Sequence, residues 1–210
     1  LLIMLLIIFS FMMYGVMTNC HLLKVIDKSS LEWFTQCFGH PSRVYEGDIL
    51  NLYMTFCATV GDVSTVLKLA SIVVICLFIF KNKHQAIWVL LMTTGTWINY
   101  LIKQTVERQR PYSHLAIDSG WSFPSGHSNA STLLFLVIML TIVPVIKVKV
   151  IRIIIIIVTS IIWISILFCR LYFHAHYLTD VIGGGTLAVV WVLLFIMAYP
   201  LFTLRNNKKN

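Results

Sequence analysis

The sequence predicts an all-α, polytopic membrane protein with six transmembrane helices. Of its 210 residues, 59% are hydrophobic and 11% are charged, and the mean hydropathy is +0.87. A soluble domain carries about a quarter charged residues. Six apolar runs approach the roughly 20 residues that an α-helix needs to cross a bilayer. A closed β-barrel is excluded because its strands alternate apolar and polar residues, whereas residues 153–158 are all apolar.

The six runs occur along the whole chain, so residues 1–210 are expected to form one membrane-embedded domain. In order, they are Leu1–Met17, Val63–Phe80, Ala86–Ile102, Gly126–Ile146, Val150–Phe168 and Val181–Leu204. The first run lacks the basic start and the small-residue cleavage site of a signal peptide, and we expect it to remain as a span. The third and fifth runs are short, so the ends of these two helices are the least well defined.

One long connection, residues 18–62, separates the first two runs. It carries five aromatic residues: Trp33, Phe34, Tyr45, Tyr53 and Phe56. Aromatic side chains favour the membrane–water interface, so this segment is expected to lie along the membrane, on a short amphipathic helix. Anchoring is the simpler role for it, and guidance of lipid toward a site is the alternative.

The distribution of charge predicts the orientation. Three polar segments hold basic residues and no acidic ones: Lys81 and Lys83; Lys147, Lys149 and Arg152; and Arg205, Lys208 and Lys209. Short cytoplasmic segments are enriched in Lys and Arg, so both termini of this plasma-membrane protein are expected to be cytoplasmic. The net charge of +8 is then a topology signal. A nucleic-acid partner is not expected, because its surface would need a concentrated basic patch.

The five cysteines do not form a recognisable framework. Cys20, Cys37 and Cys57 fall on the predicted outer side, where a disulfide is chemically allowed, while Cys76 and Cys169 lie in or near spans. Their spacings match no zinc pattern. Unpaired thiols are the simpler expectation, and a disulfide among the outer three is the alternative.

Three polar stretches stand where apolar runs meet loops on the predicted extracytoplasmic side. They contain Lys103 and Arg110; then Ser125, Gly126 and His127; then Arg170, His176 and Asp180. A single cation at a helix end is most simply explained by snorkelling toward headgroups. Ionisable residues that recur at the ends of several spans are costly and mark function. Three cations beside two histidines favour a phosphate site in the outer leaflet.

Local chemistry supports a phosphate site. Ser125 is a natural N-cap for the fourth predicted span, and the N–H groups of a helix N-terminus bind phosphate. Gly126 lets the backbone approach a ligand closely. His176 and Asp180 are four residues apart and would share a face of a helix. The carboxylate would then accept Nδ1–H of the imidazole and leave Nε2 free as a base or nucleophile.

The motifs resemble the three-part signature of the type 2 phosphatidic acid phosphatase superfamily, which contains bacterial membrane lipid phosphatases and soluble vanadium haloperoxidases. They read Lys103-x6-Arg110-Pro111, Pro124-Ser125-Gly126-His127 and Arg170-x5-His176-x3-Asp180. The signature covers residues 103–180, and the six-span layout extends the resemblance to most of the chain. Cys169 replaces a frequent serine and Leu178 a frequent proline, both peripheral positions.

The resemblance implies a role for each residue of the signature. His176 would attack phosphorus and form a phosphohistidine, Asp180 would orient it, and His127 would protonate the leaving oxygen and then activate water. The remaining residues would hold the phosphate oxygens: Lys103, Arg110, Ser125, Gly126 and Arg170. Phosphoryl transfer depends mostly on positioning and on charge stabilisation, and the family needs no metal or other cofactor.

Six polar neighbours of the signature receive no firm role. They are Glu107, Arg108, Tyr112, His114, Asp118 and His174. As loop residues they are expected to be mainly solvated spacers, and selection of the lipid headgroup is the alternative.

The expected function is hydrolysis of a lipid (di)phosphate through a phosphohistidine. Undecaprenyl diphosphate is the first choice, because it is recycled at the outer face, where the site is expected. The alternatives are a phosphatidylglycerophosphate or phosphatidic acid phosphatase of broad specificity, and a lipid phosphotransferase of the same fold. A non-enzymatic protein that binds anionic lipid would not need both histidines. A haloperoxidase is not expected, because those enzymes are soluble. No obligate protein partner is implied.

Overall fold

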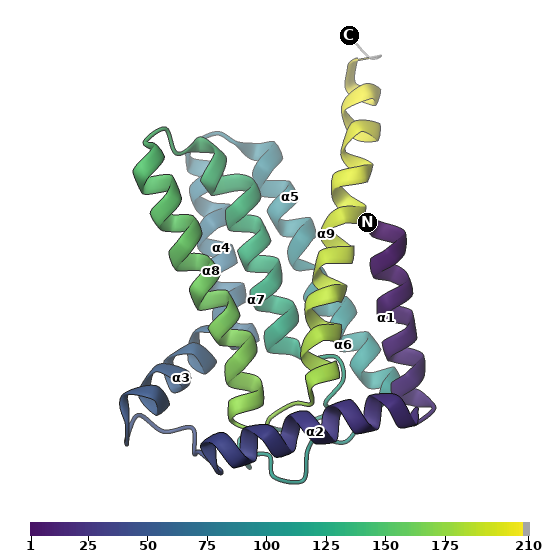
Figure 1. The fold of residues 1–210 in the computed structure, drawn as a ribbon. Helices are drawn as coiled ribbons and strands as arrows, with labels where there is room; N and C mark the ends of the chain where they lie inside the picture. Colours follow the sequence, from purple (N-terminus) through teal and green to yellow (C-terminus); the bar gives the residue numbers. More distant parts are fainter. Residues whose placement is uncertain (208–210) are drawn as a thin grey trace.

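The computed structural model describes residues 1–207 and is all-helical over that range, as predicted (Figure 1). The helices are α1 (Leu2–Met17), α2 (His21–Phe38), α3 (Ile49–Val60), α4 (Val63–Ile79), α5 (Lys83–Thr93), α6 (Gly95–Val106), α7 (Gly126–Val137), α8 (Lys149–Tyr172) and α9 (Leu178–Asn207). After α7 the chain continues through a π-helical turn, Ile138–Ile142, and a 3-10 turn, Val143–Val145.

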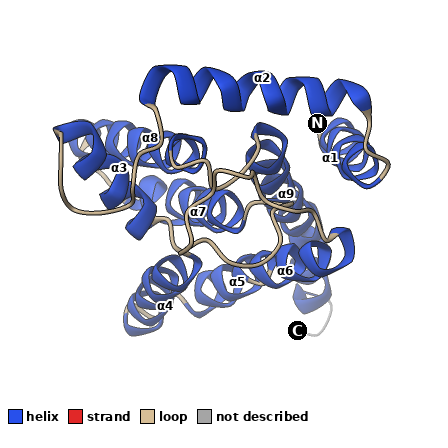
Figure 2. Cartoon of the chain, turned by 90° about the horizontal axis from the view of Figure 1, so that it is seen from below, coloured by secondary structure: helices blue, strands red, loops and turns tan. Residues whose placement is uncertain are grey.

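Helix α7 forms the centre of the bundle. It packs against α9, α8, α4, α6 and α5, which surround it in Figure 2. Its first turns bury small side chains, among them Ser128, Ala130 and Ser131. Small residues let helices approach closely in a membrane. Gly184 of α9 fits this pattern, because a Cβ there would overlap the carbonyl oxygen of Ser125.

The six predicted apolar runs all fall in helices, but not as six simple spans. Three helical segments are long and apolar enough to cross a membrane alone: Gly126–Val145, Lys149–Tyr172 and Leu178–Ala198. Two bent pairs of helices, α1 with α2 and α3 with α4, also pass the length and composition test. If each pair counts as one span, the described residues contain up to five candidate spans. The third predicted run is divided at Thr94, where α5 ends and α6 begins. The membrane-protein class therefore holds, and the count of six spans stays a prediction.

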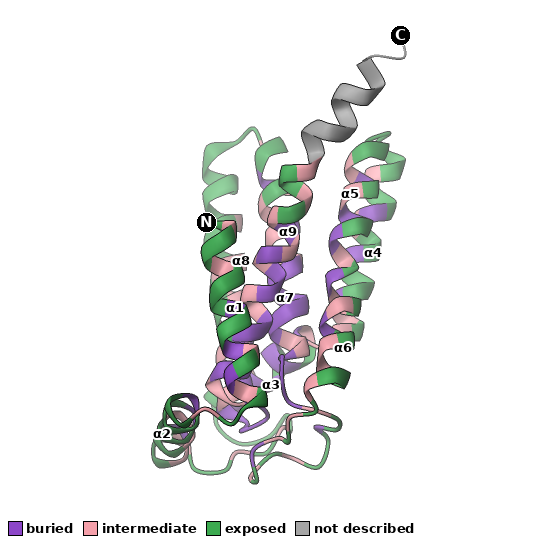
Figure 3. Ribbon diagram, turned by 90° about the vertical axis from the view of Figure 1, so that its right-hand side faces the viewer, coloured by how far each residue is buried: buried purple, intermediate pink, exposed green. Residues whose placement is uncertain are grey.

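The segment 18–62 contains two helices where one was expected. Helix α2 turns by 89° from α1 and lies across the end of the bundle, as Figures 1 and 3 show. It is amphipathic: it buries Leu23, Asp27 and Phe34 against the bundle, whereas Lys24 and Trp33 are exposed. Such a helix is suited to the membrane surface. Helix α3 begins at Ile49, and the preceding Asp48 is its N-cap, because the Asp48 side chain accepts the Asn51 N–H.

The two ends of the bundle carry different kinds of polar residues. The α4–α5 and α7–α8 connections, which carry the basic residues, lie at one end (Figure 1). The α6–α7 and α8–α9 connections lie at the other end beside α2, and they hold the signature residues. This separation is the one that the charge distribution predicts, while the sidedness itself stays a prediction. Lys208 and Lys209 lie outside the described residues.

The cysteines are free throughout the described chain, so the structure contains none of the disulfides considered from the sequence. Cys57 and Cys169 are buried and pack in one cluster with Phe34 and Phe173. Both behave as small apolar side chains there.

Candidate active site

The signature residues converge at one end of the bundle, where backbone contacts fix them. Nζ of Lys103 donates to the carbonyl oxygens of Trp121 (2.7 Å) and Ser122 (3.3 Å). These bonds tie the last turn of α6 to the segment that leads into α7. Arg110 donates through Nη1 to the carbonyl oxygen of Ala175 at 2.7 Å, which joins the 107–125 loop to the α8–α9 turn.

Arg170 supplies the strongest indication of an anion site. Its side chain is 1% exposed, and Nη2 donates to Oδ1 of Asp118 at 2.6 Å. Its Nε and Nη1 are buried without a partner among the described residues. Unpaired buried donors on a charged group are costly. A ligand with several anionic oxygens, such as a phosphate, would satisfy them.

The N-terminus of α7 has the predicted capped form. The side chain of Ser125 accepts the Ser128 N–H at 3.3 Å, and the backbone N–H of Ser125 donates to the carbonyl oxygen of Asp180 at 3.0 Å. The second bond holds the start of α7 against the start of α9. Gly126 follows, so the first N–H groups of α7 are not covered by a bulky side chain.

His176 is buried in the α8–α9 turn with its ring nitrogens in defined roles. Arg110 Nη1 lies 3.2 Å from Nε2. A guanidinium can only donate, so Nε2 accepts and Nδ1 carries the hydrogen. Burial, with the nearby charges of Lys103, Arg170 and Arg110, holds the pKa of His176 well below its ordinary value. The imidazole is therefore neutral at pH 7, which is the form that the predicted role of nucleophile requires.

The predicted direct contact between His176 and Asp180 needs correction. Nδ1 is 3.5 Å from Oδ2 of Asp180, and the hydroxyl of Ser122 lies between them. Ser122 Oγ is 3.2 Å from Nδ1 and donates to Oδ2 at 2.5 Å. The helical argument fails because α9 begins at Leu178, so His176 precedes the helix that carries Asp180.

His127 pairs with a carboxylate to which the sequence had given no role. Its Nε2 lies 2.8 Å from Oδ1 of Asp62, a close contact without hydrogen-bond geometry. Oδ2 of Asp62 accepts from Nη2 of Arg43 at 2.7 Å. Burial alone would raise the pKa of Asp62, but its interactions with His127 and Arg43 outweigh this and lower the pKa to about 2.

The expectation of solvated spacers is wrong for three of the six neighbours. Asp118 and His174 are buried. Arg108 is only 15% exposed and pairs with Asp27 and Asp180, at 2.6 Å each. The expectation is right for Tyr112, which is 85% exposed, and for Glu107 and His114, which are exposed as well. No local sequence signal could have revealed the Arg108–Asp27 pair, because its members are 81 residues apart.

Comparison with known proteins decides the family. Residues 85–203 match the model of the PAP2 superfamily. The chain belongs to this superfamily. A curated protein, phosphatidylglycerophosphatase B of Bacillus subtilis (strain 168), is 30% identical over 153 residues, which are 70% of this chain and 73% of the relative. The resemblance seen in the three motifs is thereby confirmed, and the chain is a membrane lipid phosphatase of the PAP2 superfamily.

A solved structure confirms the fold of the PAP2 chain. This chain is similar to the crystal structure of a transmembrane PAP2-type phosphatidylglycerolphosphate phosphatase from Bacillus subtilis, with a TM-score of 0.76 and 21% identity. The match covers 92% of each chain.

Proposed function

We propose that the protein hydrolyses phosphatidylglycerophosphate to phosphatidylglycerol and inorganic phosphate. The observation that carries this proposal is the arrangement around His176, whose neutral, Arg110-facing Nε2 lies in a cluster of cations. The relative named phosphatidylglycerophosphatase B supports this substrate more than undecaprenyl diphosphate, the first expectation from the sequence. Undecaprenyl diphosphate becomes the competing substrate in the test.

The proposed reaction has two steps. Nε2 of His176 forms a bond to phosphorus while the bond between phosphorus and the lipid oxygen breaks, and His127 gives a proton to that oxygen. Water, deprotonated by His127, then attacks phosphorus and breaks its bond to Nε2. Arg110, Arg170 and Lys103 stabilise the charge on the phosphoryl oxygens. The cations take the place of metal ions in this scheme, and no cofactor takes part.

The two carboxylates support the two histidines in different ways. Asp62 lies against His127, where its negative charge opposes burial and the Arg170 charge, which both disfavour the protonated imidazole needed to give a proton. Asp180 reaches His176 through Ser122, which holds the hydrogen on Nδ1 and leaves Nε2 unprotonated.

The proposed topology follows the charge distribution. Six spans, cytoplasmic termini and a site at the outer leaflet agree with basic connections at the end of the bundle opposite the signature residues. Helix α2 would lie in the outer interface. The substrate would then reach the site from the lipid phase, with its phosphate at headgroup depth.

Phosphate release by the detergent-purified protein tests the function. Phosphatidylglycerophosphate, phosphatidic acid and undecaprenyl diphosphate are compared at equal concentration with excess EDTA. We expect the fastest release from phosphatidylglycerophosphate, unaffected by EDTA and lost in His176→Ala. His84→Ala, an exposed histidine at the other end of the bundle, serves as the control and should retain full activity.

Three results would count against the proposal. Faster release from undecaprenyl diphosphate would make that lipid the substrate. Loss of activity in EDTA would contradict metal-free chemistry. Transfer of the phosphoryl group to an added lipid or sugar alcohol in preference to water would identify a phosphotransferase.

A further inference from the structure

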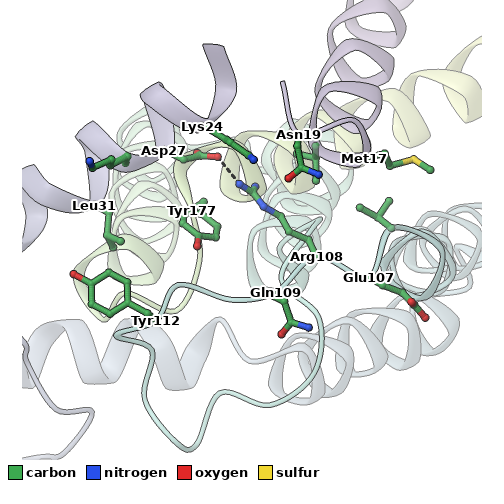
Figure 4. A pocket seen from close by; sticks show the side chains of 13 residues that line it. Met17, Asn19, Lys24, Asp27, Leu31, Glu107, Arg108, Gln109, Tyr112 and Tyr177 are labelled. Carbon is green, nitrogen blue, oxygen red and sulfur yellow. Dashed lines mark hydrogen bonds and ion pairs between the residues drawn. The ribbon is translucent and has the colours of Figure 1, made fainter. Parts of the chain in front are cut away.

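Arg108 connects the surface helix α2 with the start of α9. Nη1 donates to Oδ1 of Asp180 (2.6 Å) and to the hydroxyl of Thr179 (2.7 Å), and Nη2 donates to Oδ2 of Asp27 (2.6 Å). Figure 4 shows the Arg108 side chain directed toward Asp27, with the contact drawn as a dashed line. One guanidinium thus joins two carboxylates that are 2% exposed or less.

Asp27 holds the same point of the chain by a second route. Its Oδ1 accepts the N–H of Thr179 at 2.9 Å, and its Oδ2 accepts the Thr179 hydroxyl at 2.7 Å. Thr179 lies in the first turn of α9, where N–H groups have no partner within the helix. Asp27 therefore caps α9 from α2, one residue before Asp180. The backbone and the side chain of Asp180 are both fixed by this arrangement.

The contacts continue from Asp180 to the nucleophile. Its Oδ2 accepts from the Ser122 hydroxyl at 2.5 Å and from the Tyr177 N–H at 2.8 Å. Ser122 Oγ then meets Nδ1 of His176 at 3.2 Å. An unbroken series of charged and hydrogen-bonded groups runs from α2 through Arg108, Asp180 and Ser122 to the imidazole of His176.

Arg108 contacts Oδ1 of Asp180, whereas the Ser122 hydroxyl contacts Oδ2. With Asp27 and Tyr177, Arg108 lines a cavity of about 650 Å³ between the α1–α2 corner and the 107–112 segment. None of Lys103, Arg110 and Arg170 lines this cavity. Both terminal nitrogens of Arg108 are already bonded to Asp27, Thr179 and Asp180. These bonds hold the Asp180 carboxylate in place.

We propose that Arg108, held by Asp27 of α2, is a positioning residue that fixes the imidazole of His176 through Asp180 and Ser122. This inference rests on the proposed role of His176 as the nucleophile. Because Asp27 belongs to α2, the seating of the surface helix is coupled to the catalytic geometry. A displacement of about 1 Å in a catalytic constellation can lower the rate about 100-fold.

The test compares the steady-state kinetics of Arg108→Gln, Arg108→Lys and Asp27→Asn with those of two controls. Lys28→Gln and Glu32→Gln remove exposed charges of the same helix, with side chains 78% and 57% exposed. We expect kcat to fall about 100-fold in Arg108→Gln with KM within about twofold of wild type. Arg108→Lys, which keeps the charge, should recover part of the loss, and the controls should match wild type.

The double variant Asp27→Asn/Arg108→Gln examines whether the two residues act as one unit. If they do, its kcat is no lower than that of Arg108→Gln alone, because coupled residues are not additive. Wild-type kcat in Arg108→Gln would overturn the proposal, as would a raised KM with unchanged kcat. If Arg108→Gln does not fold, Arg108→Lys and Asp27→Asn decide the question, since unchanged kcat in both contradicts it.

A readout independent of turnover separates this proposal from the proposed function. The Nδ1–H proton of His176 should give a downfield imidazole signal in NMR spectra of the wild type, and it should be lost or shifted in Arg108→Gln. An inactive wild type with this signal and this response would refute the proposed function alone. If the wild type is active, and the imidazole signal and kcat are the same in Arg108→Gln as in the wild type, only the positioning role is refuted.

Discussion

Replacement of Asp62 by Asn tests the pairing of His127 most sharply. In the wild type, Asp62 contacts His127 at 2.8 Å and Arg43 at 2.7 Å. The substitution keeps the size of the side chain and removes its charge. Glu46→Gln is the matched control, because Glu46 is an exposed acid in the same connection.

The size of the effect follows from the pKa of Asp62. A fall from 3.8 to about 2 corresponds to roughly 2 kcal/mol of preference for the charged form in the folded protein. The side chain is 35% exposed, so solvent screening reduces the usable part to about 1 kcal/mol. For a chain of this size that amounts to about 2–4 °C in the midpoint of thermal unfolding.

The pH dependence has a defined sign. The folded-state pKa is below the unfolded value, so this stabilisation is fully present above about pH 4 and is lost as the pH falls toward 2. Thermal unfolding in detergent should place Asp62→Asn below wild type at pH 7, with a gap that narrows between about pH 4 and pH 2. Equal midpoints at pH 7, or a gap independent of pH, would refute the pairing. At neutral pH, kcat should also fall while KM stays near wild type.

Three further predictions follow from the same geometry. Ser122→Ala should lower kcat by about 10- to 100-fold with little change in KM, because it removes the hydroxyl between His176 and Asp180; wild-type kinetics would show that this hydroxyl is dispensable. Gly184→Ala should destabilise the protein by about 1–3 kcal/mol, because the added Cβ would overlap the Ser125 carbonyl oxygen; thermal unfolding measures this loss. Gly120→Ala is the control for backbone strain, because a Cβ at Gly120 meets no atom within 4 Å but φ is +73°. The acidic limb of the kcat/KM profile should lie below pH 6.5, because the pKa of His176 is lowered well below that value; a limb at or above 6.5 contradicts a neutral, buried nucleophile.

Local sequence patterns predicted those parts of the fold that depend on neighbouring residues. The apolar runs predicted helices, and the Ser125 cap is present as expected. The break at Thr94 was not predicted, because residues 86–102 are mostly apolar on both sides of it. The predicted His176–Asp180 hydrogen bond was wrong in detail, since spacing alone did not show that α9 begins at Leu178.

The motifs predicted the residues that converge at one end of the bundle, whereas their supporting partners were missed. Arg43 and Asp62 are 19 residues apart, and Arg108 and Asp180 are 72 residues apart. Contacts of this kind arise when helices pack, and they impose no periodic pattern on either segment. Buried ion pairs between distant segments therefore became visible only in three dimensions.

Trapping of the phosphorylated enzyme tests the central claim most directly. The protein is mixed with phosphatidylglycerophosphate labelled in its terminal phosphate and quenched within one turnover, and the protein-bound label is examined for stability in base and acid. We predict an acid-labile, base-stable label on His176 that is absent in His176→Ala and present in His84→Ala. A label that persists in His176→Ala, or phosphate release without any labelled protein, would contradict nucleophilic attack by His176.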